Sequence, residues 1–126
     1  MAILGIGTDV VSIARVNNVH ERHGERFALR ILSPSEMDEY KKLDHPVPFL
    51  AKRFAVKEAC AKALGTGMRD GIEFNQISIG HDSSGKPLLE LFDKAQAVAK
   101  ERGINNLHVS ISDERDFAVA FVLTES

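Results

Sequence analysis

The sequence contains few of the residues on which disulfide-bonded and membrane-spanning proteins depend. It holds one cysteine, Cys60, in 126 residues, so no disulfide can form within the chain. It has no tryptophan and one tyrosine, and no apolar run approaches the ~20 residues that cross a bilayer. The first residues lack the basic segment of a secretory signal. We therefore expect a cytoplasmic protein and no membrane partner.

The sequence also carries little net charge. Its 16 Lys and Arg residues against 18 Asp and Glu residues give −2, which argues against general nucleic-acid binding. Its length and its hydrophobic content of 44% predict one domain, over residues 1–126, with one core. The charge is uneven, however, because residues 15–30 hold four arginines against two glutamates. This local excess of positive charge is opposite in sign to the whole chain.

The central stretch of the sequence, residues 49–71, reads FLAKRFAVKEACAKALGTGMRDG. Its five alanines favour a helix, and the glycines at positions 65 and 67 predict where that helix ends. At about 3.6 residues per turn, the apolar side chains cover most of the helix surface, which is typical of a buried helix. Charged side chains nevertheless interrupt this surface at Arg53, Lys57, Glu58 and Lys62.

Glu58 and Lys62 are four residues apart, so they lie on one face of the predicted helix. The sequence leaves two interpretations open. In the first, the two side chains form a solvent-exposed ion pair that stabilises the helix only slightly. In the second, they are partly buried, which is costly for both charges unless a ligand compensates them. A bound metal ion and a phosphate would satisfy both groups.

Asp9 follows a short apolar run at residues 2–6 that is typical of a buried strand. We expect this strand to give way to Gly7, which would place Asp9 near the strand end. An aspartate in such a position commonly stabilises a turn. The alternative is that Asp9 binds a divalent cation, because Mg²⁺ prefers oxygen ligands.

Ser12 is suited to cap a helix over residues 13–23, and Gly24 would end that helix. If the helix continued past Gly24, one outward stripe would hold Arg15, Val19, Arg22 and Arg26. This stripe is either a solvated basic face or a docking surface for an acidic protein, for which complementary charge raises the association rate. In the second case, Val19 and Phe27 would supply apolar anchors.

Glycine and proline divide the rest of the chain into shorter elements. Leu107, Val109 and Ile111 alternate with polar residues, which predicts a half-buried strand with His108 on its polar face. A histidine on such a face is usually just solvated, and so is a turn lysine such as Lys86. The other expected elements are a helix from Ser33 to about Leu43, strands at 74–80 and 88–91, a helix at 93–102 and a last strand at 117–123.

Four short motifs together resemble those of one enzyme family. FAVKEACAKALG at residues 54–65 resembles the signature of the 4′-phosphopantetheinyl transferases, and GIGTDVV at residues 5–11 resembles the family's other signature. GKP at residues 85–87 and HVSIS at residues 108–112 follow in the family's order. Because the motifs span nearly the whole chain, the sequence is identified as a member of the small bacterial holo-[acyl-carrier-protein] synthases within this superfamily.

The resemblance implies a Mg²⁺-dependent transfer of 4′-phosphopantetheine from coenzyme A to a serine of apo acyl carrier protein, with release of adenosine 3′,5′-bisphosphate. It implies that Asp9 and Glu58 bind the metal and that Lys62 contacts the pyrophosphate. Glu58 would also orient or deprotonate the serine. Arg53 and His108 are expected at the 3′-phosphate of the coenzyme. The further coenzyme contacts would be Lys62, Gly65, Lys86 and Pro87, and the carrier protein would bind Arg15, Val19, Arg22, Arg26 and Phe27.

The resemblance also implies an α+β fold, with an antiparallel sheet packed on the long central helix. Small members of the family are homotrimers with active sites between subunits, so we expect a homotrimer in which a neighbour supplies Arg53 or His108. One position departs from the family pattern, because Asp113 stands where a histidine often follows the Ser-x-Ser unit. Two other functions remain compatible with the residues: a non-catalytic module for an acidic partner, and a Mg²⁺-dependent nucleotide pyrophosphatase.

Overall fold

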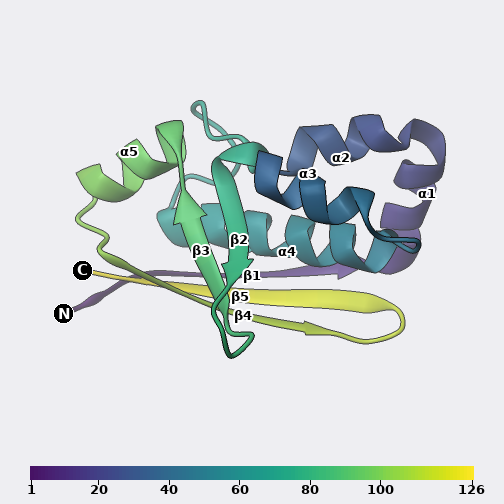
Figure 1. The fold of residues 1–126 in the computed structure, drawn as a ribbon. Coiled ribbons are helices and arrows are strands. Elements are labelled where there is room, and N and C mark those ends of the chain that lie inside the picture. Colours follow the sequence, from purple (N-terminus) through teal and green to yellow (C-terminus); the bar gives the residue numbers. More distant parts are fainter.

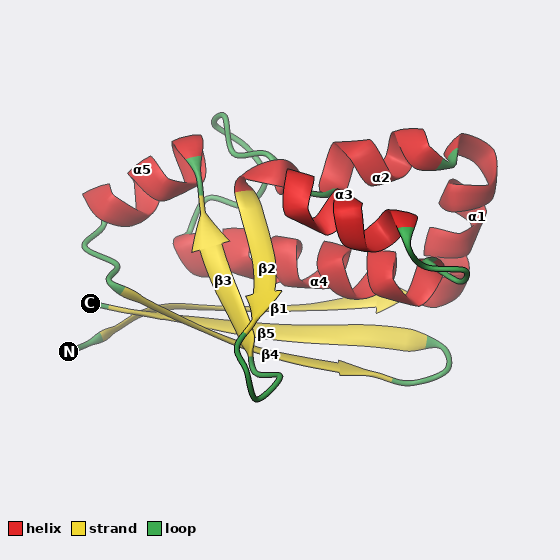
Figure 2. Ribbon diagram, viewed as in Figure 1, coloured by secondary structure: helices red, strands yellow, loops and turns green.

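The computed structural model describes residues 1–126 and has an α+β fold, as the family resemblance implies (Figures 1 and 2). No helix is both long and apolar enough to cross a membrane. The elements in chain order are β1 (Ile3–Ser12), α1 (Ile13–His23), α2 (Glu25–Ile31), α3 (Pro34–Lys41), α4 (Val47–Leu64), the 3₁₀ helix η1 (Phe74–Gln76), β2 (Ile77–His81), β3 (Pro87–Leu91), α5 (Asp93–Glu101), β4 (Asn106–Asp113) and β5 (Phe117–Glu125).

The strands form two sheets. β5 is the middle strand of the larger sheet and pairs antiparallel with β1 on one side and β4 on the other. β2 and β3 form a separate two-stranded hairpin. Ile3 pairs with Glu125, so the two ends of the chain lie side by side (Figure 1). The expected last two strands are confirmed, and both are longer than the sequence pattern indicates.

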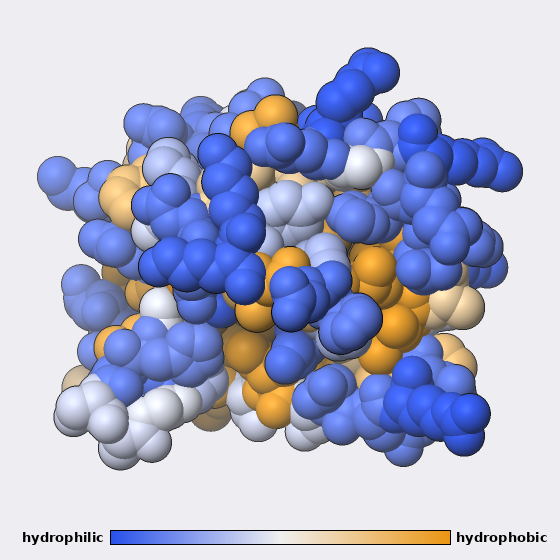
Figure 3. All heavy atoms as spheres, turned by 45° about the vertical axis from the view of Figure 1, so that its right-hand side comes forward, coloured by the Kyte–Doolittle hydropathy of each residue, from blue (hydrophilic) through white to orange (hydrophobic).

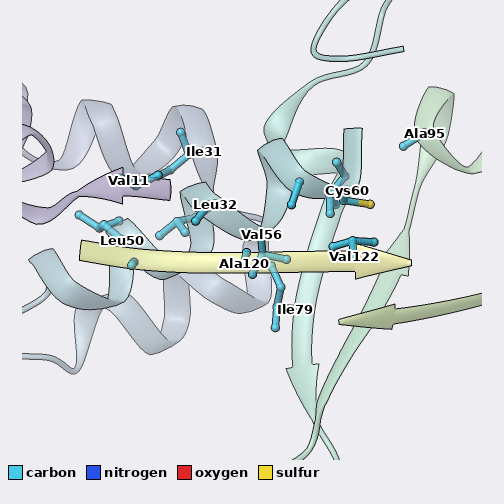
Figure 4. Close-up of a cluster of buried hydrophobic side chains, with 14 of the residues drawn as sticks. Val11, Ile31, Leu32, Leu50, Val56, Cys60, Ile79, Ala95, Ala120 and Val122 are labelled. Atoms are coloured by element: carbon cyan, nitrogen blue, oxygen red, sulfur yellow. The ribbon is translucent and has the colours of Figure 1, made fainter. Parts of the chain in front are cut away.

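α4 lies lengthwise between the larger sheet and the helices α1–α3 (Figure 1). It begins at Val47, two residues before the expected start, because a proline is well tolerated in the first turn of a helix. It ends at Gly65 in a left-handed conformation, as predicted. The helix is buried on most sides and supplies much of the core, which Figure 4 shows where Val56 and Cys60 meet side chains of β5.

Two glycines let β1 contact the backbone of α4 directly. A Cβ atom on Gly7 would lie 1.9 Å from the Ala59 carbonyl oxygen, and one on Gly5 would lie 2.1 Å from that of Ala63. Only glycine fits at such an approach. These glycines therefore lie inside a strand, and the expectation that the strand ends before Asp9 is wrong: β1 continues to Ser12.

Gly24 separates the basic segment into two helices. Ser12 Oγ accepts a hydrogen bond from the Arg15 backbone N–H, so the predicted cap of α1 is confirmed. Gly24 then adopts φ 55° and ψ −131°, a conformation that ends α1 and redirects the chain into α2. Arg26 and Phe27 consequently lie on α2, and the stripe that a continuous helix would present does not form.

Two other expected boundaries are wrong. α3 ends at Lys41 rather than near Leu43. The strand expected from Phe74 starts only at Ile77, because the chain first forms η1. The buried side chain of Gln76 holds this turn, since its amide donates to the Gly71 carbonyl oxygen and accepts from the Ala95 backbone N–H.

Candidate functional site

Asp9, Glu58 and Lys62 meet where β1 packs on α4. Lys62 Nζ lies 3.2 Å from Asp9 Oδ1 and donates to the Thr8 carbonyl oxygen at 2.8 Å. Glu58 lies one helical turn before Lys62, but the ion pair of Lys62 is with Asp9 and not with Glu58. The solvent-exposed Glu58–Lys62 pair that the sequence allows therefore does not form.

Glu58 is a half-buried carboxylate in an unfavourable electrostatic environment. Burial raises its pKa above the ordinary value, the negative charge of Asp9 raises it further, and Lys62 opposes both effects. The fold therefore places two carboxylates close enough to repel each other and compensates them with one ammonium. A carboxylate perturbed by burial and by a specific charged neighbour is typical of functional sites.

The three side chains line a hollow of about 480 Å³, called here the carboxylate hollow. Its other walls come from β1, α1 and α2: Val10, Val11, Ser12, Arg15, Val16, Val19 and Phe27, with Phe54 of α4. Figure 3, in which the α1 end of the molecule is turned forward, shows exposed hydrophobic surface surrounded by hydrophilic residues. The fold thus brings the predicted catalytic residues together with Arg15, Val19 and Phe27. Arg22 and Arg26 are exposed and do not line the hollow.

The donor atoms of the carboxylate hollow fit Mg²⁺. Asp9 and Glu58 offer only oxygens, and no group of three or more His, Cys, Asp or Glu side chains could hold a metal by itself. Mg²⁺ is commonly held by one or two carboxylates, while waters and substrate phosphates complete its coordination. A divalent cation between these two carboxylates would also remove their repulsion. The site therefore suits a metal that arrives with a phosphate-bearing ligand.

A second hollow, of about 240 Å³, lies between α4 and the turn that joins β2 to β3. We call it the hairpin hollow, and it brings together Arg53, Gly85 and Pro87. Lys52 and His81, which the sequence analysis missed, add two further basic side chains. The sequence signal for Lys52 was its place next to Arg53, directly before the FAVKEA motif. The remaining lining residues are Phe49, Ile111 and Asp113.

Lys86 is exposed in the turn beside the hairpin hollow. The Asp82 carboxylate shapes this turn, because Oδ1 accepts hydrogen bonds from the Ser84 backbone, the Ser84 hydroxyl and the Lys86 backbone at 2.7–2.9 Å. The Ser84 hydroxyl is the main cause of a lowered pKa of Asp82. The turn is therefore preformed and presents Lys86 to solvent.

His108 and Gly65 lie outside both hollows within one chain. His108 is on the exposed face of β4, where Nε2 lies 2.6 Å from Glu125 Oε1. Gly65 ends α4, and the Arg102 guanidinium next to it donates to the Leu64 carbonyl oxygen. A single chain therefore distributes the predicted coenzyme contacts over several separate places.

A buried charged cluster that was not predicted from the sequence lies next to the hairpin hollow. Lys57 is fully buried, and its Nζ donates to Glu36 Oε1 at 2.6 Å. Burial lowers the pKa of Lys57, and Glu36 opposes this shift. Ser33 and Glu36 form a capping box that the S-x-x-E spacing could have revealed. Nothing in the sequence, however, connects Glu36 with Lys57 or with Arg53, which lies 3.6 Å from Glu36.

Comparison with known proteins places this chain among relatives of one kind. Residues 5–122 match the ACPS family, described as the 4′-phosphopantetheinyl transferase superfamily. The chain is 56% identical over 126 residues to the holo-[acyl-carrier-protein] synthase of Yersinia pestis (strain Pestoides F), and the match covers all of both chains.

Solved structures agree with the sequence matches. The holo-[acyl-carrier-protein] synthase of Neisseria meningitidis is 46% identical, with a TM-score of 0.92 over 99% of this chain and 100% of that one. The Helicobacter pylori synthase, solved in complex with coenzyme A, is 36% identical, with a TM-score of 0.81 over 95% and 99%. The chain therefore belongs to the 4′-phosphopantetheinyl transferase superfamily.

Proposed function

We propose that this chain transfers 4′-phosphopantetheine from coenzyme A to a serine of an apo acyl carrier protein. One observation carries the proposal: a single hollow joins charged groups suited to a pyrophosphate with a basic and apolar wall suited to an acidic protein. The residues that meet there are Asp9, Glu58 and Lys62 on one side and Arg15, Val19 and Phe27 on the other. Membership of the superfamily supports the same reaction.

In this reaction, the serine hydroxyl oxygen attacks the β-phosphorus of coenzyme A. An oxygen–phosphorus bond forms to the carrier protein, the phosphoanhydride bond breaks, and adenosine 3′,5′-bisphosphate leaves. Phosphoryl transfer depends mainly on positioning and charge neutralisation. Lys62 stabilises the negative charge of the pyrophosphate. Glu58 orients the hydroxyl and receives its proton.

Asp9 and Glu58 are the residues that would hold Mg²⁺, each through carboxylate oxygens. A bound Mg²⁺ supplies charge neutralisation at the leaving phosphate and orients the diester. Lys62, which is paired with Asp9 in this structure, is free to turn toward the pyrophosphate because its side chain is half exposed. The three side chains are thus assigned to the phosphate end of the coenzyme.

The nucleotide end of the coenzyme is assigned to the hairpin hollow. Arg53, Lys86 and Pro87 lie in or beside it, together with Lys52 and His81 as further basic groups. His108 and Gly65 lie elsewhere in the chain, so one chain alone does not surround the coenzyme. We therefore propose a homotrimer in which the coenzyme lies between neighbouring chains.

The outer face of the larger sheet supports this assembly. It exposes a set of apolar side chains, and the neighbouring strands place them next to one another because Val10 pairs with Val119 and Thr8 with Phe121. Exposed apolar patches of this kind mark protein interfaces. The patch consists of Leu4, Ile6, Val10, Phe117, Val119 and Phe121.

The patch reaches the edge of the catalytic residues. Ile6 and Phe121 line a small hollow of about 240 Å³ together with Lys62. A chain packed on this face would therefore lie next to the ammonium that is assigned to the pyrophosphate. The proposed interface and the proposed active site are continuous.

The experiment that tests the reaction is the intact mass of an apo acyl carrier protein after incubation with this chain, coenzyme A and Mg²⁺. A gain of about 340 Da, the mass of one phosphopantetheine group, is expected and should vanish with EDTA. An unmodified carrier with intact coenzyme A would instead support a non-catalytic binding module. Coenzyme A cleaved without carrier modification would support a nucleotide pyrophosphatase.

A further inference from the structure

A buried polar cluster joins three elements beside the hairpin hollow. Glu36 of α3 lies between Lys57 of α4 and the backbone of β2, and both of its carboxylate oxygens are occupied. Oε1 accepts from Lys57 Nζ at 2.6 Å and Oε2 accepts from the Ile79 backbone N–H at 2.9 Å. Neither charged side chain of this pair is accessible to solvent. Glu36 is therefore a fixed contact point between the helices and the β2–β3 hairpin.

Arg53 is held by the same cluster on several sides. Its Nη1 donates to the Ile79 carbonyl oxygen at 2.8 Å and lies 3.6 Å from Glu36 Oε2. Its Nη2 lies 3.5 Å from Glu39 Oε2, and the guanidinium carbon lies 4.6 Å from the centre of the Phe49 ring. Arg53 also lines the hairpin hollow. Two carboxylates of α3 thus fix the orientation of a basic side chain at the edge of that hollow.

The cluster also fixes the hairpin itself. Lys57 Nζ donates to the carbonyl oxygens of Ile77 and Phe74 at 2.6 Å and 3.0 Å. Together with the bond from Arg53 to Ile79, these contacts attach η1 and the first residues of β2 to α4. β2 leads directly into the turn that carries Gly85 and Pro87. The distance between Arg53 on α4 and these turn residues is therefore set by the buried cluster.

We propose that Glu36 and Glu39 are positioning residues for the coenzyme: they hold Arg53 and the β2–β3 hairpin in the arrangement that forms the hairpin hollow. This inference rests on the proposed function, because it assumes that the nucleotide end of coenzyme A binds there. Neither carboxylate touches the reacting atoms. Their effect is on the affinity for the nucleotide and not on the transfer step.

The chemistry of the cluster favours this role over a purely stabilising one. A buried ion pair is a weak source of stability, since apolar side chains of similar volume often do as well or better. Functional sites, in contrast, need supporting residues that lock the orientation of the binding groups. A charged cluster placed directly behind a basic lining residue provides such support.

The test compares Glu36→Gln and Glu39→Gln with the control Asp38→Asn. Asp38 is exposed on the same helix and makes no ion pair or side-chain hydrogen bond. Three quantities are measured for each variant: the Kd of adenosine 3′,5′-bisphosphate by calorimetry, the KM values for coenzyme A and carrier protein, and kcat. Thermal unfolding reports whether each variant is folded.

Glu36→Gln is expected to raise the nucleotide Kd and the KM for coenzyme A about tenfold, because Arg53 and β2 lose the contact that holds them in position at the hairpin hollow. The carrier KM and kcat should stay unchanged. Glu39→Gln, which changes only the more exposed contact, should give a smaller rise of about two- to threefold. Asp38→Asn should match the wild type in every quantity.

Unchanged nucleotide affinity in Glu36→Gln, or an equal rise in both KM values, would overturn the proposal. If Glu36→Gln does not fold, the proposal is tested with Glu39→Gln alone. An unchanged nucleotide affinity in Glu39→Gln would then overturn the proposal. The calorimetric measurement does not depend on transfer. A wild type that binds nucleotide without modifying the carrier would thus contradict the proposed function alone, and a wild type that binds no nucleotide would contradict both.

Discussion

At the scale of single residues, the site depends on a carboxylate whose charge is incompletely compensated. Glu58 is half buried and near Asp9, and the one ammonium at the site, on Lys62, contacts Asp9. In the absence of a ligand this arrangement is unfavourable. It becomes favourable when a divalent cation compensates the two carboxylates and a pyrophosphate pairs with the Lys62 ammonium.

Replacing Glu58 should abolish transfer without unfolding the chain. Glu58→Gln keeps the size of the side chain but removes the charge, so kcat/KM should fall by about three orders of magnitude or more. The fold should be retained or slightly stabilised, because the repulsion from Asp9 disappears. A steady-state assay with circular dichroism as the folding control checks both statements. Activity close to that of the wild type would contradict the assignment.

Cys60 should be chemically inert in the folded chain. It is fully buried, and burial raises the pKa of its thiol to about 12, although Lys57 opposes this shift. The thiolate is the reactive form of cysteine. Because the pKa of Cys60 is raised, its thiol stays protonated between about pH 7 and 9, the range in which a free cysteine ionises and becomes reactive. A thiol-modifying reagent should therefore label Cys60 only after denaturation. Rapid labelling of the native protein would show that α4 is not packed as described.

The residue types of the site could be predicted from the sequence, but their partners could not. The motif pattern identified Asp9, Glu58 and Lys62, and the structure brings these residues together. Spacing along α4 placed Glu58 and Lys62 on one face and allowed an ion pair between them, whereas Lys62 contacts Asp9 because β1 passes directly beside it. The role of Glu36 could not be predicted for the same reason, because its partner Lys57 is 21 residues away and on another helix.

At the scale of elements, the contact between β1 and α4 decides where the proposed catalytic groups lie. Asp9 comes from the strand, and Glu58 and Lys62 come from the helix. The glycines of β1 allow the two backbones to touch, which is why the side chains of both elements reach one hollow. The GIGTD motif is therefore a packing motif as well as a source of the aspartate.

Gly7→Ala tests this contact. The new methyl group would lie 1.9 Å from the Ala59 carbonyl oxygen, so β1 would have to move away from α4. We expect a loss in the free energy of unfolding of about 3 kcal/mol or more, or no folded protein. Gly80→Ala is the matched control, because a Cβ atom there meets nothing within 4 Å. Chemical denaturation of both variants gives the comparison, and equal stabilities would contradict the described packing.

The charge of α1 should control carrier binding and not chemistry. Arg15→Glu reverses a charge on the wall of the carboxylate hollow, so the KM for the acidic carrier protein should rise about tenfold or more. Much of the rate should return at high carrier concentration. Lys100→Glu on α5 is the control, since Lys100 is exposed and far from this wall in sequence and fold. An unchanged carrier KM in Arg15→Glu would exclude α1 as the docking helix.

Most elements could be predicted because their periodicity and their glycine or proline boundaries are local properties. α1, α4, α5 and the last two strands fall within a few residues of the expected ranges. The errors occur where tertiary contacts override the local pattern. β1 runs through Gly7 because α4 lies against it, and Phe74 leaves the expected strand because the Gln76 side chain stabilises a turn.

At the scale of the whole molecule, one chain does not gather the predicted coenzyme contacts in one place, and it exposes an apolar face. The predicted coenzyme contacts are divided between the two hollows, the end of α4 and the outer face of β4. The apolar patch lies on that same outer face and borders Lys62. Assembly of several chains would explain both features together.

Phe121→Lys should break this assembly. It places a charge in the middle of the apolar patch, where burial against a second chain would be costly. Light scattering should then give the mass of one chain instead of three, and transfer activity should fall with it. Leu88→Lys is the control, because Leu88 is similarly exposed but lies on β3. A fully active monomer would contradict a site shared between chains.

The central claim is that the carboxylates of one hollow hold the metal on which transfer depends. Its most direct test is the rate of carrier-protein mass gain as Mg²⁺ is added back to metal-free protein, for the wild type and for Asp9→Asn. We expect a wild-type rate that is lost in EDTA and restored by Mg²⁺, and an Asp9→Asn rate that stays low or needs far more metal. Equal metal dependence in both proteins, or full activity in EDTA, would contradict it.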